Sequence, residues 1–177
     1  MNNEQVILRE TDWNTAKDYN DMFNMMQNED GIKDVFRQRT DRLNTTSVSW
    51  MIQAGNKTIG FINLVVEKAN YDYLFLDMGI IKDYRGKGYG KKFLQEVQNL
   101  VEHSDLPYVL METKKNNINA NIAAEDIACL ITEVEDRNVY LLQKSRLQEF
   151  IDTNQMEKLA EHFDKTSHKK QLFKEYY

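Results

Sequence analysis

A short glycine-rich segment, Arg85-Gly86-Lys87-Gly88-Tyr89-Gly90, carries the clearest chemical signal in the chain. Its three glycines alternate with other residues just before a helix-like run, so several backbone N–H groups lack side-chain cover. Such groups at a helix N-terminus bind phosphate, because the unpaired donors and the helix dipole act in the same direction. The flanking basic residues are Lys82, Arg85, Lys87, Lys91 and Lys92, against one acid, Asp83. The pattern predicts a site for one bound anion, whereas a plain strand-to-helix turn would not need these cations.

The spacing of the glycines excludes two familiar nucleotide-binding loops. A Walker-type loop needs four residues between its first glycine and a Gly-Lys pair that is followed by Ser or Thr. Here three residues separate Gly86 from Gly90-Lys91, and Lys92 occupies the hydroxyl position. A dinucleotide fingerprint needs G-x-G-x-x-G directly after the first strand of a fold. This segment has a different spacing and follows three expected antiparallel strands, so both interpretations fail.

Residues 78–94 resemble the strand–loop–helix core of the GNAT superfamily of acyl-CoA N-acyltransferases. The family signature, Arg/Gln-x-x-Gly-x-Gly/Ala, is met by residues 85–90, and lysine stands at position 82, where the family usually has proline. The resemblance is firm over residues 58–111 and extends loosely over residues 6–142. It implies a GNAT-like fold and an enzyme that uses an acyl-CoA.

The resemblance also implies where the coenzyme binds. The backbone of residues 85–90 would hold the coenzyme A pyrophosphate, and the end of the fourth strand would pair with the pantetheine arm like another strand. The backbone N–H of Ile80 would then polarise the acyl carbonyl. The cofactor-binding residues expected in this way are Ile80, Ile81, Lys82, Arg85, Gly86, Lys87, Gly88, Tyr89, Gly90 and Lys91.

Acyl transfer to an amine needs a base for the ammonium proton and usually an acid for the departing thiolate. Many family members supply the acid from a tyrosine in a pattern like Asn-x-x-Ala-x-x-Leu-Tyr. This chain has Asn119 and Asn121 with two alanines nearby, but the tyrosine position falls on residue 126, 127 or 128, and none of these is tyrosine. The acid would come from elsewhere, or the thiolate would leave unaided, since a thiol has a pKa of about 8.5. The tyrosines that could approach are Tyr84, Tyr89 and Tyr140.

Two carboxylates are candidate bases, Asp77 on the expected fourth strand and Glu112 at the end of the expected fifth strand. Glu112 follows an apolar run, so it would emerge near the carboxyl ends of a parallel pair, where ligands bind. Alternatively, neither residue is catalytic. Asp77 would then be a hydrogen-bonded residue of its strand, and Glu112 a solvated carboxylate at the end of its strand. The candidate catalytic residues are therefore Glu112, Asp77 and Tyr84.

The elements that would position these residues follow from hydrophobic periodicity. A helix is expected over residues 13–26, capped by Thr11 or Asp12, and a second over about 31–43. Short glycine-containing links between strands indicate an antiparallel meander. The strands of the first half are expected at residues 6–10, 47–54, 58–68 and 71–81.

An amphipathic helix at residues 91–103 and an apolar strand at 108–111 complete a βαβ unit, which implies a parallel pair. A short helix over residues 116–126 and a hairpin of 127–134 with 139–143 should follow. The expected fold class is mixed α/β: a GNAT-like central sheet, mostly antiparallel with one parallel pair, flanked by helices. Residues 1–143 would form the acyltransferase domain, and residues 144–177 a helical extension of the same domain.

Composition limits the class of protein. The chain has 177 residues, an apolar fraction of 41% and a net charge of −5, which fit a globular domain without general affinity for nucleic acid or anionic membranes. No long apolar stretch or secretory signal is present, so no membrane span is expected. A single cysteine, Cys129, allows no internal disulfide and indicates a reducing compartment. Because Cys129 lies in an apolar run, we expect it to be a small buried hydrophobic residue. The three histidines show no metal-ligand spacing. We expect a cytoplasmic protein without a metal.

The expected function is transfer of an acetyl group from acetyl-CoA to a primary amine of a small molecule or peptide. The alternative is a catalytically weak or inactive acyl-CoA-binding module that acts through partners, which the missing tyrosine favours. An acidic stretch within residues 125–136 would draw a cationic amine, or is simply a solvated face. Apolar residues in the tail would allow a homodimer contact.

Overall fold

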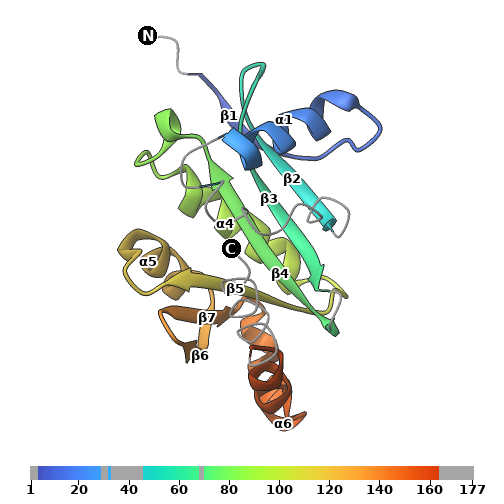
Figure 1. Cartoon of the computed structure of the whole chain (residues 1–177), viewed down its shortest axis with the longest axis vertical. Helices are drawn as coiled ribbons and strands as arrows, with labels where there is room; N and C mark the ends of the chain where they lie inside the picture. The colour runs from blue at the N-terminus through green and yellow to red at the C-terminus, as the bar shows by residue number, and fades with distance from the viewer. Residues whose placement is uncertain (1–3, 29–31, 33–45, 68–69, 164–177) are drawn as a thin grey trace, which may run out of the picture.

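The structure is a computed structural model that describes residues 4–28, 32, 46–67 and 70–163 (Figure 1). A seven-stranded sheet forms its centre, in the order β1-β2-β3-β4-β5-β7-β6. Every neighbouring pair is antiparallel except β4 and β5, which run parallel. The strands are β1 (Val6–Glu10), β2 (Thr46–Ala54), β3 (Lys57–Glu67), β4 (Asn70–Ile80), β5 (Tyr108–Lys114), β6 (Cys129–Val134) and β7 (Arg137–Leu141). The predicted mixed sheet with one parallel pair is confirmed.

The helices lie on both faces of this sheet (Figure 1). They are α1 (Ala16–Asn28), α4 (Tyr89–Glu102), α5 (Ile118–Ile127) and α6 (Leu147–Asp152), and residues 155–163 are helical as well. Short 3₁₀ turns, η1 (Lys82–Tyr84) and η2 (Lys144–Arg146), precede α4 and α6. Within the described residues, no helix is both long enough and apolar enough to cross a membrane.

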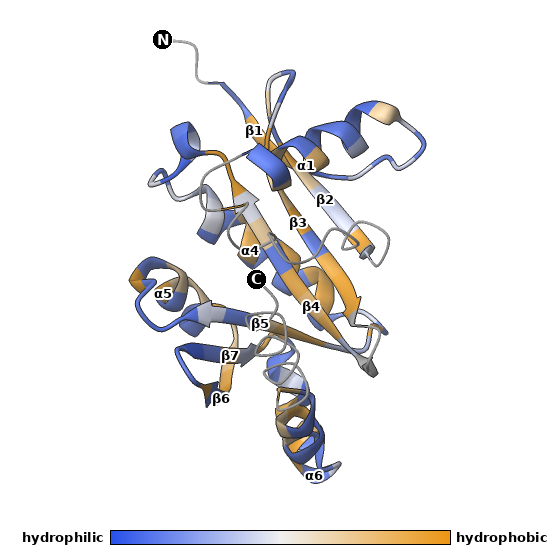
Figure 2. Cartoon of the chain, viewed as in Figure 1, coloured by the Kyte–Doolittle hydropathy of each residue, from blue (hydrophilic) through white to orange (hydrophobic). Residues whose placement is uncertain are grey.

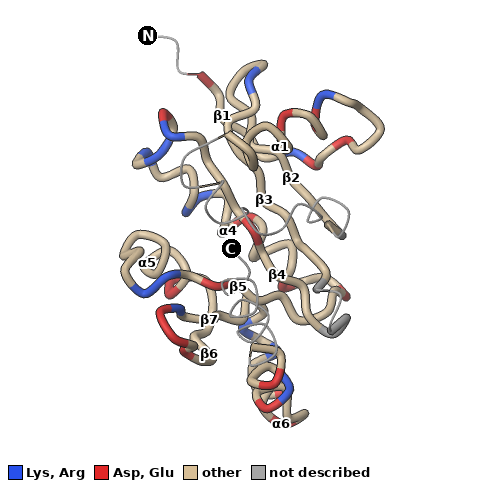
Figure 3. Tube along the Cα trace, in the orientation of Figure 1, with Lys and Arg blue, Asp and Glu red and all other residues tan. Residues whose placement is uncertain are grey.

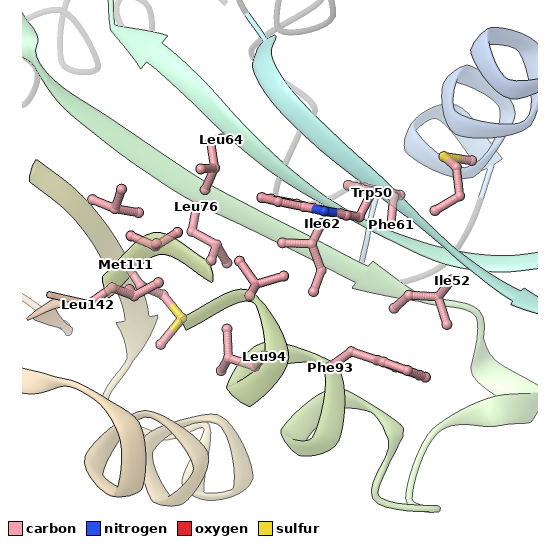
Figure 4. Close-up of a cluster of buried hydrophobic side chains, with 14 of the residues drawn as sticks. Trp50, Ile52, Phe61, Ile62, Leu64, Leu76, Phe93, Leu94, Met111 and Leu142 are labelled. Atoms are coloured by element: carbon pink, nitrogen blue, oxygen red, sulfur yellow. The ribbon is translucent and has the colours of Figure 1, made fainter. Parts of the chain in front are cut away.

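Alternation along β3 and β4 sends side chains to two different cores, because successive strand residues point to opposite faces. On one face, Phe93 and Leu94 of α4 pack under Ile62, Leu76 and Met111 (Figure 4). Apolar residues dominate β3 and β4, whereas the loop before α4 is hydrophilic (Figure 2). Burial of these aliphatic and aromatic side chains, each worth roughly 1.5–3 kcal/mol, fixes α4 against the end of β4.

The second core lies on the opposite face and is built partly by the C-terminal segment. Tyr73 and Phe75 of β4 and Leu110 of β5 pack there with Phe150 of α6. Leu159 and Phe163 from the helical residues 155–163 join the same cluster. Within residues 147–163 the large apolar side chains other than Ile151, which is 49% exposed, therefore belong to this second core.

The first helix begins later than predicted and buries one charged residue together with three methionines. The Asp12 side chain accepts from the N–H of Asn14 at 3.0 Å, forming a turn before α1 rather than its cap. The buried face includes Asp18, because Arg9 of β1 binds this carboxylate with two hydrogen bonds of 2.7 Å. Trp13 lies before the helix and is 42% exposed. The predicted helix over residues 31–43 lies outside the described residues except for Ile32.

Two further predictions need correction. Strand β5 runs to Lys114, because its pairing with β7 continues as far as Arg137, so Glu112 lies inside the strand and not at its end. Cys129 is only half-buried, since it opens the edge strand β6. The predicted hairpin is confirmed as β6 and β7, with a tight turn that places Glu135 at a positive φ of 54°.

Candidate active site

The parallel strands β4 and β5 pair over only three residues each. Tyr73, Leu74 and Phe75 lie beside Tyr108, Val109 and Leu110. Beyond this point the strands diverge (Figure 1), while β3 continues along the other side of β4 as far as the Gly60–Ile80 pair. Residues 76–80 of β4 thus have a strand on one side only within the described part of the chain. We call the other side the open edge of β4.

The backbone of Ile80 faces this open edge. The N–H of Ile81 donates to the carbonyl of Ile59 on β3 at 2.8 Å. Because backbone groups alternate along a strand, Ile80 must point its N–H and carbonyl away from β3. The Ile80 carbonyl does so, since it accepts from Nε of Arg85 at 2.7 Å. A strand-like ligand beside β4 would therefore meet the N–H of Ile80, whereas Ile81 is engaged with β3.

The glycine segment follows η1 and leads into α4. Gly86 and Gly88 have φ values of 73° and 84°, in the left-handed region that favours glycine. A Cβ placed on either residue would meet nothing within 4 Å, so packing does not select these glycines. A Cβ on Gly90, by contrast, would lie 3.0 Å from Cε of Met78. The third glycine therefore lets α4 approach β4, while the first two shape a loop with open space around it.

The start of α4 presents backbone donors without acceptors inside the helix. Gly88 is the N-cap and supplies no side-chain cap, and no acid lies in the first turn. The first helical bond runs from the N–H of Lys92 to the carbonyl of Gly88 at 3.1 Å. The N–H groups of residues 89–91 precede it and have no intrahelical partner. These donors, the helix dipole and the surrounding lysines fit a pyrophosphate.

Charges are distributed unevenly around this region (Figure 3). Basic residues gather on η1 and the start of α4, whereas the β6–β7 turn is acidic. Lys91 forms an ion pair of 2.6 Å with Asp126 of α5, and its hydrogen bond lowers the pKa of that carboxyl. Glu133 of the acidic stretch pairs with Lys115 at 3.3 Å. Among the described residues, no group of three His, Cys, Asp or Glu could hold a metal ion.

The two candidate bases lie on the same face of the sheet. Asp77 follows Phe75 by two residues, and Glu112 follows Leu110 by two, so both project to the face opposite α4. Asp77 is 9% exposed and lies on the open edge of β4. Glu112 forms an ion pair of 2.9 Å with Arg137 of β7. The structure therefore places both carboxylates beside the divergence of the strands, with Glu112 engaged by a cation.

The candidate tyrosines lie elsewhere. The Tyr84 hydroxyl donates to the Glu4 carboxylate at 3.2 Å. Glu4 lies just before β1, the edge strand on the β2 side of the sheet and distant from β5. Desolvation and this hydrogen bond raise the Tyr84 pKa above its usual value. Tyr140 is fully buried and donates to Oδ1 of Asn121 at 2.9 Å, and burial raises its pKa. Tyr89 stacks on Phe93 within α4. None of these contacts directs a hydroxyl to the open edge of β4.

Helix α5 shows where the family tyrosine would stand. Its buried residues are Asn121, Ala124 and Ile127, which match the Asn-x-x-Ala-x-x-Leu spacing. The following position is Ala128, which is 6% exposed and donates its N–H to the carbonyl of Ala124. The sequence left residues 126, 127 and 128 as candidates for the tyrosine position. The buried residues of α5 set the alignment with the family pattern and select residue 128. No phenol can come from it.

The strand residues two positions before and after Asp77 contact residues that sequence reasoning did not identify. The ring of His162 stacks on Phe75, with centroids 5.5 Å apart. On the other side of Asp77, a Cβ on Gly79 would lie 2.7 Å from Cδ1 of Ile32. Periodicity can indicate that Ile32 is apolar and that His162 lies in a helix. It cannot indicate that both contact residues of β4. No local sequence signal could have found them.

Comparison with known proteins agrees with this geometry. The model of the acetyltransferase (GNAT) family matches residues 13–125, more than half of the chain. The chain therefore belongs to the GNAT acetyltransferase family, and it is an acyl-CoA N-acetyltransferase by class. No curated protein matches the sequence.

Solved structures share the fold at low sequence identity. The ribosomal-protein-S18-alanine N-acetyltransferase of Escherichia coli has a TM-score of 0.52 at 14% identity, covering 77% of this chain and 90% of that one. A GNAT acetyltransferase of Desulfovibrio desulfuricans reaches 0.56 at 12% identity, covering 77% and 98%. A ribosomal L7/L12 alpha-N-protein acetyltransferase, in complex with coenzyme A, has 0.52 at 15% identity, covering 77% and 92%.

Proposed function

We propose that this enzyme transfers an acetyl group from acetyl-CoA to a primary amine of a small molecule or peptide. The observation that carries the proposal is the open edge of β4. It presents the N–H of Ile80 between the glycine loop on the α4 side and the Asp77 carboxylate on the opposite face. The two substrates would thus approach the same strand from different faces.

The coenzyme would bind on the α4 side. The side chains of Met78 and Ile80 lie against Gly90 at the start of α4, so the open edge leads directly to the glycine loop. The N–H groups of residues 86–91 would bind the pyrophosphate, with Lys82, Lys87 and Lys91 nearby. To contact the pyrophosphate, Lys91 would have to leave its ion pair with Asp126. The free energy of this pair is small, because both side chains are 53% exposed. Binding of coenzyme A by a neighbour of the same fold supports the proposal.

The amine would arrive on the Asp77 face. Asp77 accepts a proton from the ammonium, and the neutral nitrogen attacks the thioester carbonyl carbon. A C–N bond forms, the nitrogen releases its second proton to solvent, the C–S bond breaks, and the electron pair leaves with sulfur. The N–H of Ile80 stabilises the negative charge that develops on the carbonyl oxygen. Asp77 is preferred to Glu112 as the base, because it lies on β4 between the pairing with β5 and the Ile80 N–H.

The departing thiolate needs no protein acid in this proposal. Ala128 stands at the family's tyrosine position, and the hydroxyls of Tyr84 and Tyr140 are directed to Glu4 and Asn121. A thiol with a pKa of about 8.5 is already a fair leaving group near neutral pH. Solvent then supplies the proton that converts the thiolate to the free thiol.

Calorimetry and thiol release together test the function. The protein should bind coenzyme A, and with acetyl-CoA it should release free thiol faster in the presence of a primary amine. Binding without amine-dependent release would favour the alternative, an acyl-CoA-binding module acting through partners. The substitution of the family tyrosine by Ala128 is the observation that favours this alternative. Absence of binding would contradict both functions.

A further inference from the structure

The start of α4 and the end of α5 lie beside each other, and an ion pair joins them. Lys91, in the first turn of α4, contacts the Asp126 carboxylate at 2.6 Å. Ala124 and Ile127 of α5 belong to the same buried core as Phe93 of α4, so packing holds the two helix ends together. The helices follow β4 and β5 along the chain, and these are the strands that diverge at the open edge. The ion pair therefore links the two helices that follow the diverging strands.

Asp126 carries a negative charge at the negative end of its own helix. Helix α5 ends at Ile127 and has no basic residue in its last turn. A carboxylate in that position is disfavoured by the helix dipole, whereas one near a helix N-terminus is favoured. Helix α4 has no acid in its own first turn. Through Lys91, Asp126 therefore supplies the start of α4 with the negative charge that α4 lacks.

A pyrophosphate at the glycine loop would need the same cation. Its oxygens would accept hydrogen bonds from the Lys91 ammonium, and an ionised carboxylate that stayed on this ammonium would repel them. Asp126 is ionised at neutral pH, because the hydrogen bond and the charge of Lys91 lower the pKa of its carboxyl. Pyrophosphate and Asp126 thus compete for Lys91.

A second cation stands ready for the displaced carboxylate. Nζ of Lys144, on η2, donates to the backbone carbonyl of Asp126 at 3.2 Å. Lys144 is exposed, and so are Lys91 and Asp126, each 53%. All three side chains can therefore exchange partners without disturbing a buried group.

We propose that Asp126 is a built-in competitor of the coenzyme: it occupies Lys91 in the free protein, and the pyrophosphate must displace it in order to bind. The inference rests on the proposed function and concerns regulation of its coenzyme site. The displaced carboxylate stays near Lys144 and returns to Lys91 when coenzyme A leaves. Asp126 thereby weakens coenzyme binding and promotes release of the product after each turnover.

Calorimetry with coenzyme A measures this competition. Asp126→Asn keeps the size of the side chain and removes its charge. It should tighten coenzyme A binding by about 3-fold to 5-fold, the upper range for an exposed ion pair. Glu125→Gln is the matched control, because it removes the same charge from an exposed position of α5, and successive helix residues do not face the same side. It should change the affinity by less than about 1.5-fold, since water and salt screen a charge without a direct contact.

Two further measurements separate competition for Lys91 from a general effect of charge. In a Lys91→Gln background, the affinity gained by Asp126→Asn should be smaller than in the wild type, because contacting residues are energetically coupled. Raising the salt concentration should narrow the difference in affinity between the wild type and Asp126→Asn, since exposed charges are screened.

Thermal unfolding and product inhibition give independent readouts. At one fixed concentration of coenzyme A, the rise in Tm should be larger for Asp126→Asn than for the wild type, because tighter binding stabilises the folded state more. In turnover, free coenzyme A should be a stronger inhibitor of Asp126→Asn than of the wild type. A variant whose fold was merely damaged would not gain affinity.

Three results would overturn the competition. The first is unchanged or weaker coenzyme A binding by Asp126→Asn. The second is an equal gain in Glu125→Gln, which would assign the effect to net charge. The third is an undiminished gain in the Lys91→Gln background, which would show that Lys91 is not the contested cation. In each case coenzyme A still binds, so the proposed function stands. Absence of binding in both the wild type and Asp126→Asn would instead contradict the proposed function, and the competition with it.

Discussion

The carbonyl of Ile80 accepts a hydrogen bond of 2.7 Å from Nε of Arg85, five residues further along the chain. This bond ties the first residue of the family signature to the end of β4. It also shows that Ile80 directs its peptide groups away from β3, because the N–H and carbonyl of a strand residue share one side. The signature arginine therefore has a structural role that precedes any ligand: it orients the strand end that would bind the thioester.

Gly88→Ala should weaken coenzyme A binding by about 10-fold or more. Alanine at a φ of 84° is strained by about 1–2 kcal/mol, and relief of that strain would rotate the N–H groups out of the anion site. Gly55→Ala is a matched control, because Gly55 also has a positive φ, of 56°, but lies in the β2–β3 turn. Both variants should lose similar stability in urea, and calorimetry should show weaker coenzyme binding for Gly88→Ala alone. Equal affinities would argue against the loop as the pyrophosphate site.

Asp77→Asn should lower kcat/KM by about 100-fold to 10,000-fold, the usual effect of removing a general base. Coenzyme A affinity should not change, because the carboxylate faces away from α4. Glu112→Gln tests the competing assignment. It removes a partly exposed ion pair with Arg137, so a loss of at most about 1 kcal/mol and nearly normal turnover are expected. The reverse pattern in steady-state kinetics would make Glu112 the base.

Tyr140→Phe should change stability and leave turnover intact. The Tyr140 hydroxyl is one of three donors to Oδ1 of Asn121, together with Thr113 and Asn138. Its removal should cost about 0.5–1.5 kcal/mol, while Asn121→Leu, which strands all three donors, should cost more than 2 kcal/mol. Chemical denaturation measures both. A 100-fold fall in kcat for Tyr140→Phe would instead identify Tyr140 as the acid that α5 lacks.

Asp18→Asn should destabilise the protein at neutral pH by about 1.5–3 kcal/mol, because it removes a bidentate, charge-assisted contact with Arg9. Hydrogen bonds from Arg9 lower the pKa of Asp18. A lowered folded pKa means that the stabilisation is complete above the ordinary carboxyl pKa of about 4 and is lost as pH falls through the lower folded value. Wild type and variant should therefore converge in strong acid. Glu149→Gln, in the exposed pair with Arg146, should cost less than about 1 kcal/mol. A gap between wild type and Asp18→Asn that persists in acid would refute this explanation.

Much of the sheet was predictable because its strands alternate strongly and are joined by short turns. The meander of β2, β3 and β4, the parallel β4–β5 pair and helix α4 all follow from local pattern. The glycine loop and its basic flanks were predictable for the same reason, since the glycines and cations lie within a few residues. Whether that loop binds coenzyme A stays a prediction.

The rest depends on contacts between distant segments. The burial of Asp18 could not be predicted, because nothing local indicates that Arg9 on another element would bind that carboxylate. The extension of β5 to Lys114 depends on β7, which comes later in the chain. Ile32 and His162, which lie against Gly79 and Phe75 of β4, likewise come from distant parts of the sequence.

The structure of the complex with acetyl-CoA tests the central claim most directly. The account predicts the pantetheine arm along the open edge of β4, the acetyl oxygen within about 3 Å of the Ile80 N–H, and the pyrophosphate on the N–H groups of residues 86–91. The acetyl carbon should then face the Asp77 side of the sheet. A coenzyme bound away from the open edge, or an acetyl group directed to the α4 face, would contradict it.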